Sequence, residues 1–461
     1  MAKKCDSETE GSSGTINRRD FLKTVGQTAL GAATLQFIPS RIVGAEGKIT
    51  IASVGDCLIA RRFYSYEEEE AFRPLLKILR SADVTFGNFE TTIEDPEATP
   101  EGIEGCPMKC DPLIADDLKW AGFDLLGLCN NHSLDYGIKG LLATIRHLDR
   151  AGIKHAGTGR NLGEAGAPAY LEAADGRVGL VACASTFPSW WPASRGHSEI
   201  KGRPGLNPLH VQTTYCLPRE KMEILKEIQG DLFQRREAQD REGGFSFLGN
   251  RFVEGALDIR REVDKKDAGE IITSIRRASR TADMVLLSLH AHEAYRSQEI
   301  PDRFLPEFAH SCIDAGADLF IGHGPHVLRG VEIYKGKPIF YSLGNFFFEA
   351  EGMKQVPMQI YEKYGLTSLD PSDFFNIVMK NYAAQSMWES VIAVASFENK
   401  RLTDLKFHPV DLHSEASRSV RGRPMMADKD MGEKIIRRLA RLSDSFGTKI
   451  NYQDGFGWVS L

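Results

Sequence analysis

Short apolar runs that end in polar residues are the main pattern along this chain. The run from Phe123 to Cys129 is too short for a typical helix, and it stops at Asn130-Asn131-His132. The segment that follows has apolar residues at helical spacing, at positions Ile138, Leu141, Leu142, Ile145 and Leu148. This order predicts a buried strand, a polar tip and an amphipathic helix.

The same unit recurs elsewhere. One predicted strand leads into Gly87-Asn88-Phe89-Glu90, another into His290-Ala291-His292, and a third into Gly322-His323-Gly324-Pro325-His326. A first strand, Lys48 to Val54, ends at Gly55-Asp56. In α/β proteins, sites are built where such strands end. Buried polar tips cost free energy unless they are paired or bind an ion, so their recurrence predicts a shared cation site.

Paired strands follow these units. Turns at Asp175-Gly176 and Lys335-Gly336 predict two hairpins, and a third is predicted between residues 389 and 408. Mixed strands with helices before them and hairpins after them predict an α/β fold, a two-sheet sandwich with helices outside.

Two stretches interrupt this pattern. Residues 187–262 turn first to a texture rich in Trp, Gly, Pro and His and then to a charged helix, and residues 350–385 separate a predicted strand from the last hairpin. We interpret both as insertions into a single domain of residues 46–425. A C-terminal segment, residues 426–461, has a helix from Lys434 to Leu442 and a tail that either docks back or frays.

The first 45 residues differ from the rest. Polar and small residues precede Arg18-Arg19, an apolar run from Thr24 to Ile38 and a small-residue end at Val43-Gly44-Ala45. This is the layout of a secretory signal, and the paired arginines followed by Phe-Leu-Lys resemble a twin-arginine signal. We expect export by the twin-arginine machinery, cleavage after Ala45, and a periplasmic or extracellular location.

Charge narrows the range of partners. The formal net charge is -6, and residues 1–45 hold six basic and four acidic residues, so the mature chain carries -6 - 2 = -8. Because the body of the chain has no basic block, nucleic acid is not an expected partner.

The cysteine pattern does not predict a disulfide framework. Seven of the eight lie beyond the predicted signal, and an odd number scattered over a long chain is not a disulfide scaffold. Cys106 and Cys110 are spaced for a small bridge in an oxidising compartment or for half of a zinc site, and the sequence leaves both open.

The candidate ligands are carboxylate, amide and imidazole side chains at the strand tips. They are Asp56, Asn88, Glu90, Asn131, His132, His290, His323 and His326. This mixture of oxygen and nitrogen donors suits one or two divalent ions such as manganese, zinc or iron. Two neighbouring ions would clamp a phosphate oxygen and activate water at neutral pH.

Five stretches, in this order, resemble the CapA family of capsule and poly-γ-glutamate synthesis proteins, which is related to the calcineurin-like metallophosphatases. They are Gly55-Asp56, Gly87-Asn88-Phe89-Glu90, Asn130-Asn131-His132-Ser133-Leu134-Asp135-Tyr136-Gly137, Gly322-His323-Gly324-Pro325-His326 and Tyr341-Ser342-Leu343-Gly344-Asn345-Phe346. The resemblance covers residues 48–349. It implies a four-layer αββα metallophosphatase-like sandwich.

The same resemblance implies roles for the tip residues. The implied metal ligands are Asp56, Asn131, His290, His323, His326 and Glu90, the last in place of a bridging aspartate. His132 and Glu90 are the implied catalytic residues, with His132 as an acid or an oxyanion stabiliser. The phosphatases have Asp-x-His in the first motif, whereas Asp56-Cys57-Leu58 lacks the histidine, so one metal site is expected to be weak or absent.

Five further residues near the tips receive supporting roles. Asn88 is expected to orient Glu90, and Asp135 to cap the helix that begins near Ile138 rather than to bind metal. Asn345 fits either a turn or a site role. Tyr295 is a candidate substrate contact, and His292 is expected to be exposed.

Three functions are compatible with these features. The first is an exported metal-dependent hydrolase that acts on a phosphoester or an anionic polymer in capsule or poly-γ-glutamate synthesis. The second is a non-catalytic accessory that binds nascent polymer in a membrane-bound capsule-synthesis complex and keeps a vestigial site. The third is proton abstraction at a peptide α-carbon by the same carboxylate and imidazoles.

Overall fold

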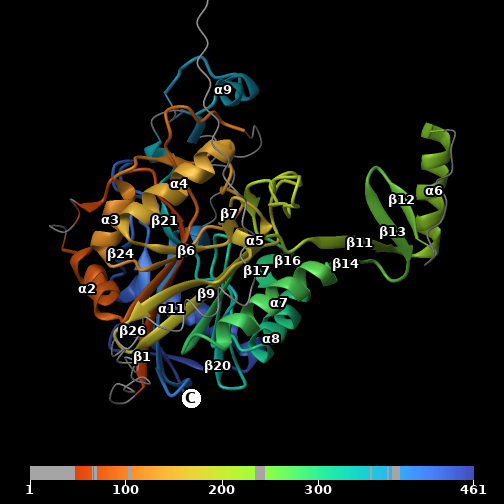
Figure 1. Ribbon diagram of the computed structural model, residues 1–461. Coiled ribbons are helices and arrows are strands. Elements are labelled where there is room, and N and C mark those ends of the chain that lie inside the picture. Colours follow the sequence, from red (N-terminus) through yellow and green to blue (C-terminus); the bar gives the residue numbers. More distant parts are fainter. Residues whose placement is uncertain are drawn as a thin grey trace, which may run out of the picture. The chain divides into compact units, whose positions relative to one another are not determined.

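Two β-sheets of this protein pack face to face and have helices on their outer sides (Figure 1). The computed structural model describes residues 47–64, 66, 70–101, 106–233, 244–353, 356–370, 373–375 and 385–461, all within one unit, Ala45–Leu461. The predicted signal segment and part of the predicted insertion at residues 350–385 lie outside the described residues.

The larger sheet of the described chain has ten strands. Its main path is β25 (Ile450–Gln453), β26 (Phe456–Val459), β23 (Arg401–Asp411), β22 (Glu389–Glu398), β1 (Lys48–Leu58), β2 (Val84–Phe89), β5 (Leu125–Gly127) and β6 (Lys154–Ala156). Two more strands pair off this path, β21 (Asn345–Phe348) with β1 and β24 (Met425–Met426) with β23.

The smaller sheet has six strands among the described residues. Its order is β19 (Val331–Tyr334), β20 (Lys337–Phe340), β18 (Leu319–His323), β15 (Met284–His290), β9 (Gly176–Ala184) and β8 (Ala169–Ala173). The hairpins predicted at Asp175-Gly176, at Lys335-Gly336 and between residues 389 and 408 are all present, as β8–β9, β19–β20 and β22–β23.

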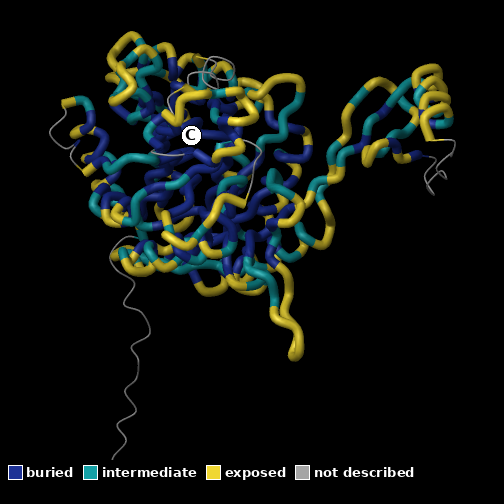
Figure 2. The backbone as a smooth tube through the Cα atoms, turned by 90° about the horizontal axis from the view of Figure 1, so that it is seen from above, coloured by how far each residue is buried: buried dark blue, intermediate teal, exposed yellow. Residues whose placement is uncertain are grey.

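Alternation along the strands divides the apolar residues into layers. On β1, Ile49 and Ile51 face the core between the sheets, whereas Ala52 and Val54 face the outer core. That outer core includes α2 (Arg73–Ser81), α3 (Ile114–Ala121) and α4 (Gly137–Ala151). The smaller sheet is covered by α7 (Lys265–Ser279) and α8 (Phe304–Asp314). The predicted four-layer αββα sandwich is confirmed, and Figure 2 shows buried segments of the backbone in its interior.

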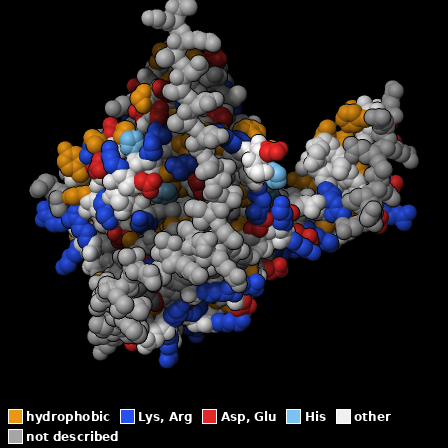
Figure 3. All heavy atoms as spheres, viewed as in Figure 1, with side chains coloured by type: hydrophobic (Ala, Val, Ile, Leu, Met, Phe, Trp, Pro, Cys, Tyr) orange, Lys and Arg blue, Asp and Glu red, His pale blue; other side chains and the backbone are white. Residues whose placement is uncertain are grey.

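The first predicted insertion has a sheet of its own, which the sequence pattern did not predict. Its strands run β12 (Phe245–Phe247), β13 (Asn250–Glu254), β11 (Val211–Leu217) and β14 (Asp258–Val263), and α6 (Arg219–Phe233) packs on them. Met222 and Phe245 are part of its small core. Side chains of α6 that remain exposed include Ile224, Ile228, Leu232 and Phe233, and Figure 3 shows hydrophobic side chains on this part of the surface.

The C-terminal segment docks onto the sandwich rather than fraying. Helix α11 (Lys429–Ser443) buries Ile435, Ile436 and Leu439 in the core between the sheets. The tail forms β25 and β26, and β26 pairs with β23, so it extends the larger sheet.

Shorter elements complete the described chain. Three strand pairs are β3 (Thr92–Ile93) with β4 (Lys109–Cys110), β7 (Thr158–Gly159) with β10 (Gly205–Leu206), and β16 (Ala294–Tyr295) with β17 (Ser297–Pro301). Two short helices are α5 (Leu162–Ala165) and α9 (Met358–Tyr364). Over the described residues, we find no helix with the length and apolar character needed to cross a bilayer.

Candidate metal centre

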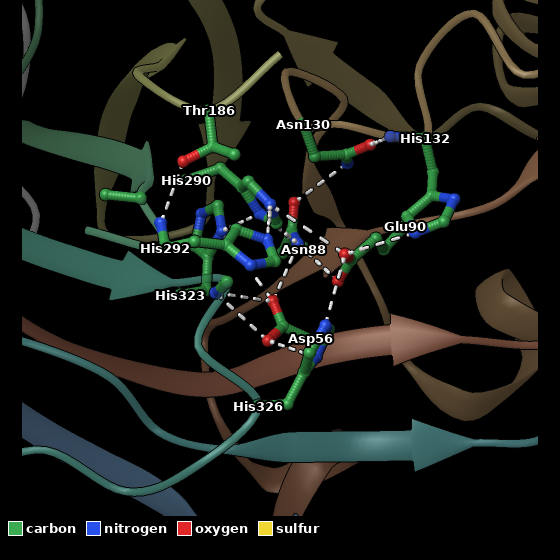
Figure 4. Close-up of polar contacts among 12 residues, drawn as sticks. Asp56, Asn88, Glu90, Asn130, His132, Thr186, His290, His292, His323 and His326 are labelled. Atoms are coloured by element: carbon green, nitrogen blue, oxygen red, sulfur yellow. Dashed lines mark hydrogen bonds and ion pairs between the residues drawn. The ribbon is translucent and has the colours of Figure 1, made fainter. Parts of the chain in front are cut away.

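Strand register brings the polar tips together at one edge of the sandwich. In the larger sheet Asp56 of β1 lies beside Asn88 of β2 and beside Asn345 of β21. In the smaller sheet His290 of β15 lies beside His323 of β18. Because the two sheets pack face to face, these tips converge from five strands, and Figure 4 shows Asp56, Asn88, His290 and His323 close together.

Glycine allows the first strand to reach this point. A Cβ atom at Gly55 would lie 1.8 Å from the carbonyl oxygen of Gly344, and the Asp56 N–H donates to that same oxygen at 3.0 Å. A side chain at position 55 would therefore push β1 away from the Gly344 turn and move Asp56 with it.

The first set of converging donors is fully buried, and we call it the inner group: Asp56, His290 and His323. One donor atom of each lies within 4.8 Å of the others. His323 Nδ1 is 3.8 Å from Asp56 Oδ1 and 3.2 Å from His290 Nδ1. The hydroxyl of Ser288 lies 2.7 Å from His323 Nε2, which fixes that ring with Nδ1 toward the group.

The electrostatics of the inner group favour ligand forms of all three side chains. Burial raises the pKa of Asp56, but the hydrogen bond and charge of His326 and the charges of His323 and His290 outweigh it and hold that pKa well below its ordinary value. Burial lowers the pKa of His323 to about 4 and that of His290 well below its usual value. At neutral pH the carboxylate is ionised and the imidazoles are neutral, as metal binding requires.

A second set lies beside the first, and we call it the outer group: Glu90, His292 and His326. Glu90 is fully buried, whereas the His326 side chain is 17% exposed and His292 is half-buried. The Asn345 Oδ1 atom lies 2.9 Å from His326 Nδ1 and so turns His326 Nε2 toward Glu90. The rings of His292 and His326 meet edge to face, with centroids 5.4 Å apart.

Glu90 joins the two groups. Its Oε1 atom lies 3.8 Å from His290 Nε2, 3.8 Å from His132 Nε2 and 4.0 Å from His326 Nε2. Burial, together with the charge of Asp56, raises the pKa of Glu90 well above its ordinary value. An anion in this position is destabilised until a cation offsets it.

Two orphaned oxygen atoms test whether the residues fit a cation. Among the described residues, the buried atoms Glu90 Oε1 and Asn131 Oδ1 have no hydrogen-bond partner. Buried polar atoms are almost always paired, so each such atom calls for an explanation. Both are oxygen ligands of the kind that divalent ions take, and imidazole nitrogens face Glu90 Oε1, so the donor set around Glu90 fits a divalent metal.

His132 lies at the rim as half of a dyad with Asp135. Its Nδ1 is 2.7 Å from Asp135 Oδ2, and the same oxygen accepts the Met108 N–H at 2.6 Å. Burial raises the pKa of Asp135, and the charge of His132 opposes this rise. Asp135 is therefore a support for His132, and the expectation that it caps the next helix is wrong, since the N-cap residue of α4 is Tyr136.

Asn88 and Asn130 form the floor beneath Asp56 and Glu90. Asn88 Nδ2 lies 2.8 Å from Asp56 Oδ1 and 3.4 Å from Glu90 Oε2. Asn130 donates to Asn88 Oδ1 at 3.1 Å and to the Phe89 carbonyl at 2.9 Å, and its own Oδ1 accepts the His132 N–H. From the sequence, Asn131 was predicted as a ligand and Asn130 had no role. In the structure, Asn130 is the asparagine that contacts Asn88.

Four further expectations can be compared with the structure. His292, expected to be exposed, is half-buried and its Nε2 lies 3.0 Å from His290 Nε2. Asn345 begins β21, and the positive φ of the turn before it falls on Gly344 (+75°) rather than on Asn345. Tyr295 lies on β16 with the guanidinium groups of Arg296 and Arg303 over its ring. Cys106 and Cys110 are both free thiols.

Comparison with known proteins identifies the family of this chain. Residues 50–350 match the family model described as bacterial capsule synthesis protein PGA_cap. Two proteins of Sinorhizobium fredii, named uncharacterized proteins y4sH and y4uA, are each 34% identical over 430 residues, which is 89% of this chain and 93% of theirs. The capsule biosynthesis protein CapA of Bacillus anthracis is 26% identical over 308 residues, 66% of this chain and 60% of its own. A Mycobacterium tuberculosis protein named probable polyglutamine synthesis accessory protein is 28% identical over 279 residues, 59% of this chain and 57% of its own.

Proposed function

This chain belongs to the PGA_cap family of bacterial capsule synthesis proteins, and we propose that it is a metal-dependent hydrolase in the synthesis or processing of a capsular or poly-γ-glutamate-type polymer. The names of the CapA and polyglutamine-synthesis relatives support the role in the polymer pathway. The family match and the buried donor groups support the metal.

The single observation that carries the proposal is the surroundings of Glu90. A fully buried carboxylate oxygen without a hydrogen-bond partner among the described residues faces the Nε2 atoms of His132, His290 and His326 at 3.8 to 4.0 Å. Purely structural carboxylates are paired directly with donors at shorter distances. A buried carboxylate oxygen that faces the metal-ligand types His290 and His326 without pairing directly with either fits a position beside a cation.

The side chains have distinct tasks in this proposal. Asp56, His290 and His323, together with Glu90, would hold manganese, zinc or iron(II), and the orphaned oxygen of Asn131 is a further candidate ligand. A bound divalent ion supplies Lewis-acid polarisation of a phosphoryl or carbonyl oxygen. His132, with Nδ1 held by Asp135, presents Nε2 at the rim and there donates a proton to the leaving group of a phosphoester or amide.

The sequence supports the location and partners that we propose. The paired arginines of residues 18–19 support twin-arginine export, so we place the mature protein in the periplasm or outside the cell, loaded with metal before it crosses the membrane. The proposed substrate is an anionic polymer or a phosphoester, and the proposed partner is a membrane-bound capsule-synthesis complex. Sequencing the mature N-terminus from the native host tests the export step, since an intact N-terminus would contradict it.

Metal content and hydrolysis, measured together, test the enzyme. We expect the purified mature chain to retain manganese, zinc or iron and to hydrolyse p-nitrophenyl phosphate, bis-p-nitrophenyl phosphate or a γ-glutamyl oligomer, with activity abolished by a chelator. Glu90→Gln should lower turnover by roughly 10²-fold or more. Glu94→Gln is the matched control, because Glu94 pairs with Lys109 and its side chain is 48% exposed. A metal-free protein without chelator-sensitive turnover would overturn the proposal.

A non-catalytic accessory is the second candidate, and Leu58 favours it. The first strand continues from Asp56 into Cys57 and Leu58, so it brings no imidazole to the centre, and Leu58 packs in an apolar cluster with Met108 and Met353. In that case the chain would bind polymer and retain metal without turnover. Saturable binding of a poly-γ-glutamate fragment by a protein that hydrolyses none of the three substrates would select this candidate.

A further inference from the structure

We propose that His292 completes a second cation site with Glu90 and His326, and that Arg329 is the positioning residue that holds this site together. The inference rests on the proposed metal-dependent function and deepens it, because it assigns the second ion to residues outside the inner group. The His292 ring supplies a ligand, and Arg329 holds the segments around that ring.

Strand geometry directs His292 toward the centre. It comes two residues after His290, the last residue of β15, so an extended chain puts both imidazoles on one side. The two Nε2 atoms lie 3.0 Å apart, and His292 shares a set of donor atoms within 4.8 Å with Glu90 and His326. When both imidazoles are neutral, only one proton can lie between these two Nε2 atoms. The nitrogen lone pairs that are not used in this way are available to a cation among the outer-group donors.

The main chain of His292 is also fixed. Its N–H donates to the Thr186 hydroxyl oxygen at 3.0 Å, which Figure 4 shows beside the ring. The hydroxyl groups of Thr186 and Ser185 donate in turn to Glu293 Oε2, at 3.1 and 2.7 Å. His292 is therefore attached to the end of β9 and is not a free loop residue.

Arg329 connects the two segments that supply the outer imidazoles. It lies three residues beyond His326, and its side chain is fully buried. Its guanidinium donates to four main-chain carbonyls of the neighbouring segment, at Gln298 (2.8 Å), Glu293 (3.0 Å), His292 (3.4 Å) and Ala291 (3.5 Å). Burial lowers the pKa of Arg329 to about 10, so the group remains charged at neutral pH.

Loss of this guanidinium would release both segments. The carbonyls of Ala291, His292, Glu293 and Gln298 would lose their shared donor, and buried carbonyls without donors are costly. His326 sits at a φ of +61°, a conformation that non-glycine residues rarely hold unless the surrounding contacts enforce it. The inner group depends on strand register instead, so it should survive the change.

Manganese titration of the metal-free mature protein, followed by atomic analysis and electron paramagnetic resonance, tests the assignment. We expect two ions and a spin-coupled signal in the wild type. His292→Ala should keep one ion with a six-line mononuclear signal, and Arg329→Met should weaken the second ion by roughly 10- to 100-fold while the first stays bound. Arg329→Lys should restore part of the affinity, because lysine keeps the charge but not the planar fork.

Controls and contrary results separate this inference from the function it rests on. His310→Ala and Arg303→Met, whose side chains are 32% and 51% exposed, should keep both ions and the coupled signal. Two coupled ions in His292→Ala, or an unchanged second affinity in Arg329→Met, would overturn the inference and leave the hydrolase proposal intact. Wild type without any bound ion would instead overturn the hydrolase proposal. If Arg329→Met fails to fold, Thr186→Val provides the second variant, with a weakened second ion expected and an unchanged one counting against the inference.

Discussion

The inner and outer groups contain similar donors but are built in different ways. Asp56, His290 and His323 all lie within central strands, and each is at most 1% exposed. In the outer group Glu90 follows the end of β2 directly, whereas the two imidazoles lie two and three residues beyond the ends of β15 and β18. Sheet register places the first set, and loop contacts place the second. We therefore expect a tightly held inner ion and a weaker, exchangeable outer ion on the more exposed side of the centre.

The strongest way to break this comparison is to remove the carboxylate of the inner group. Asp56→Asn deletes the charge that faces His323 at 3.8 Å and also His326 at 3.4 Å, so both ions should be lost and turnover should fall by about 10³-fold or more. Atomic analysis and hydrolysis of p-nitrophenyl phosphate check this. Retention of the outer ion alone would show that the two groups are independent.

The His132–Asp135 dyad separates proton transfer from ion binding. Asp135→Asn removes the anion that lies 2.7 Å from His132 Nδ1, so kcat should fall by roughly 10- to 100-fold while both ions remain. Metal content and steady-state kinetics measure the two effects separately. If ions are lost together with kcat, Asp135 supports the metal centre rather than His132.

The pH dependence of the metal-free protein probes the inner group without an ion. His323 has a pKa lowered from 6.5 to about 4, so between these values the unfolded chain binds more protons than the folded chain. Its contribution to stability is complete above 6.5 and is lost as the pH falls toward 4, by about 2 kcal/mol at about pH 5.

Urea unfolding at about pH 5 and about pH 7, with chelator present, measures this loss. In His323→Gln the difference between the two pH values should shrink by about 2 kcal/mol relative to wild type, whatever the other groups contribute. An equal difference in the two proteins would show that His323 titrates normally in the folded state.

The smallest expected effect is a change in the affinity of the outer group alone. Asn345→Ala removes the oxygen that lies 2.9 Å from His326 Nδ1, so the outer ion should bind about tenfold more weakly and the inner ion should be unchanged. Competition with a metal-sensitive dye resolves the two affinities. Equal weakening of both would show that Asn345, which pairs with Asp56 through the strands, acts on the inner group as well.

The sequence predicted the inner group better than the outer one, for a physical reason. Short apolar runs such as Phe123–Cys129 identify buried strands, and the residue that ends each run marks the edge of the sheet. The sandwich and the meeting of Asp56, His290 and His323 follow from that. The conformation of a loop depends on its contacts with residues distant in the sequence, and such contacts leave no periodic pattern in the sequence.

Arg329, Asn130 and the strands of the first insertion show this limit. A lone arginine normally predicts an exposed residue, so its burial against four carbonyls could not be inferred. Of two adjacent asparagines, the loop conformation decides which one meets Asn88. The strand-tip motifs predicted Glu90 and His326 of the outer group, whereas the alternation of His290 and His292 was the signal that could have added His292. Strand β14 has polar residues on both faces, so no amphipathic period marks it.

Gly55 shows how a short signature can have a steric origin. Position 55 has no room for even a methyl group, because the carbonyl of Gly344 occupies that space. Glycine is required before Asp56 because two backbone segments approach each other closely there, and it takes no part in chemistry. A combinatorial library of this centre should therefore keep Gly55 and Gly344 and vary the histidines, because variants at the histidines can fold and be compared.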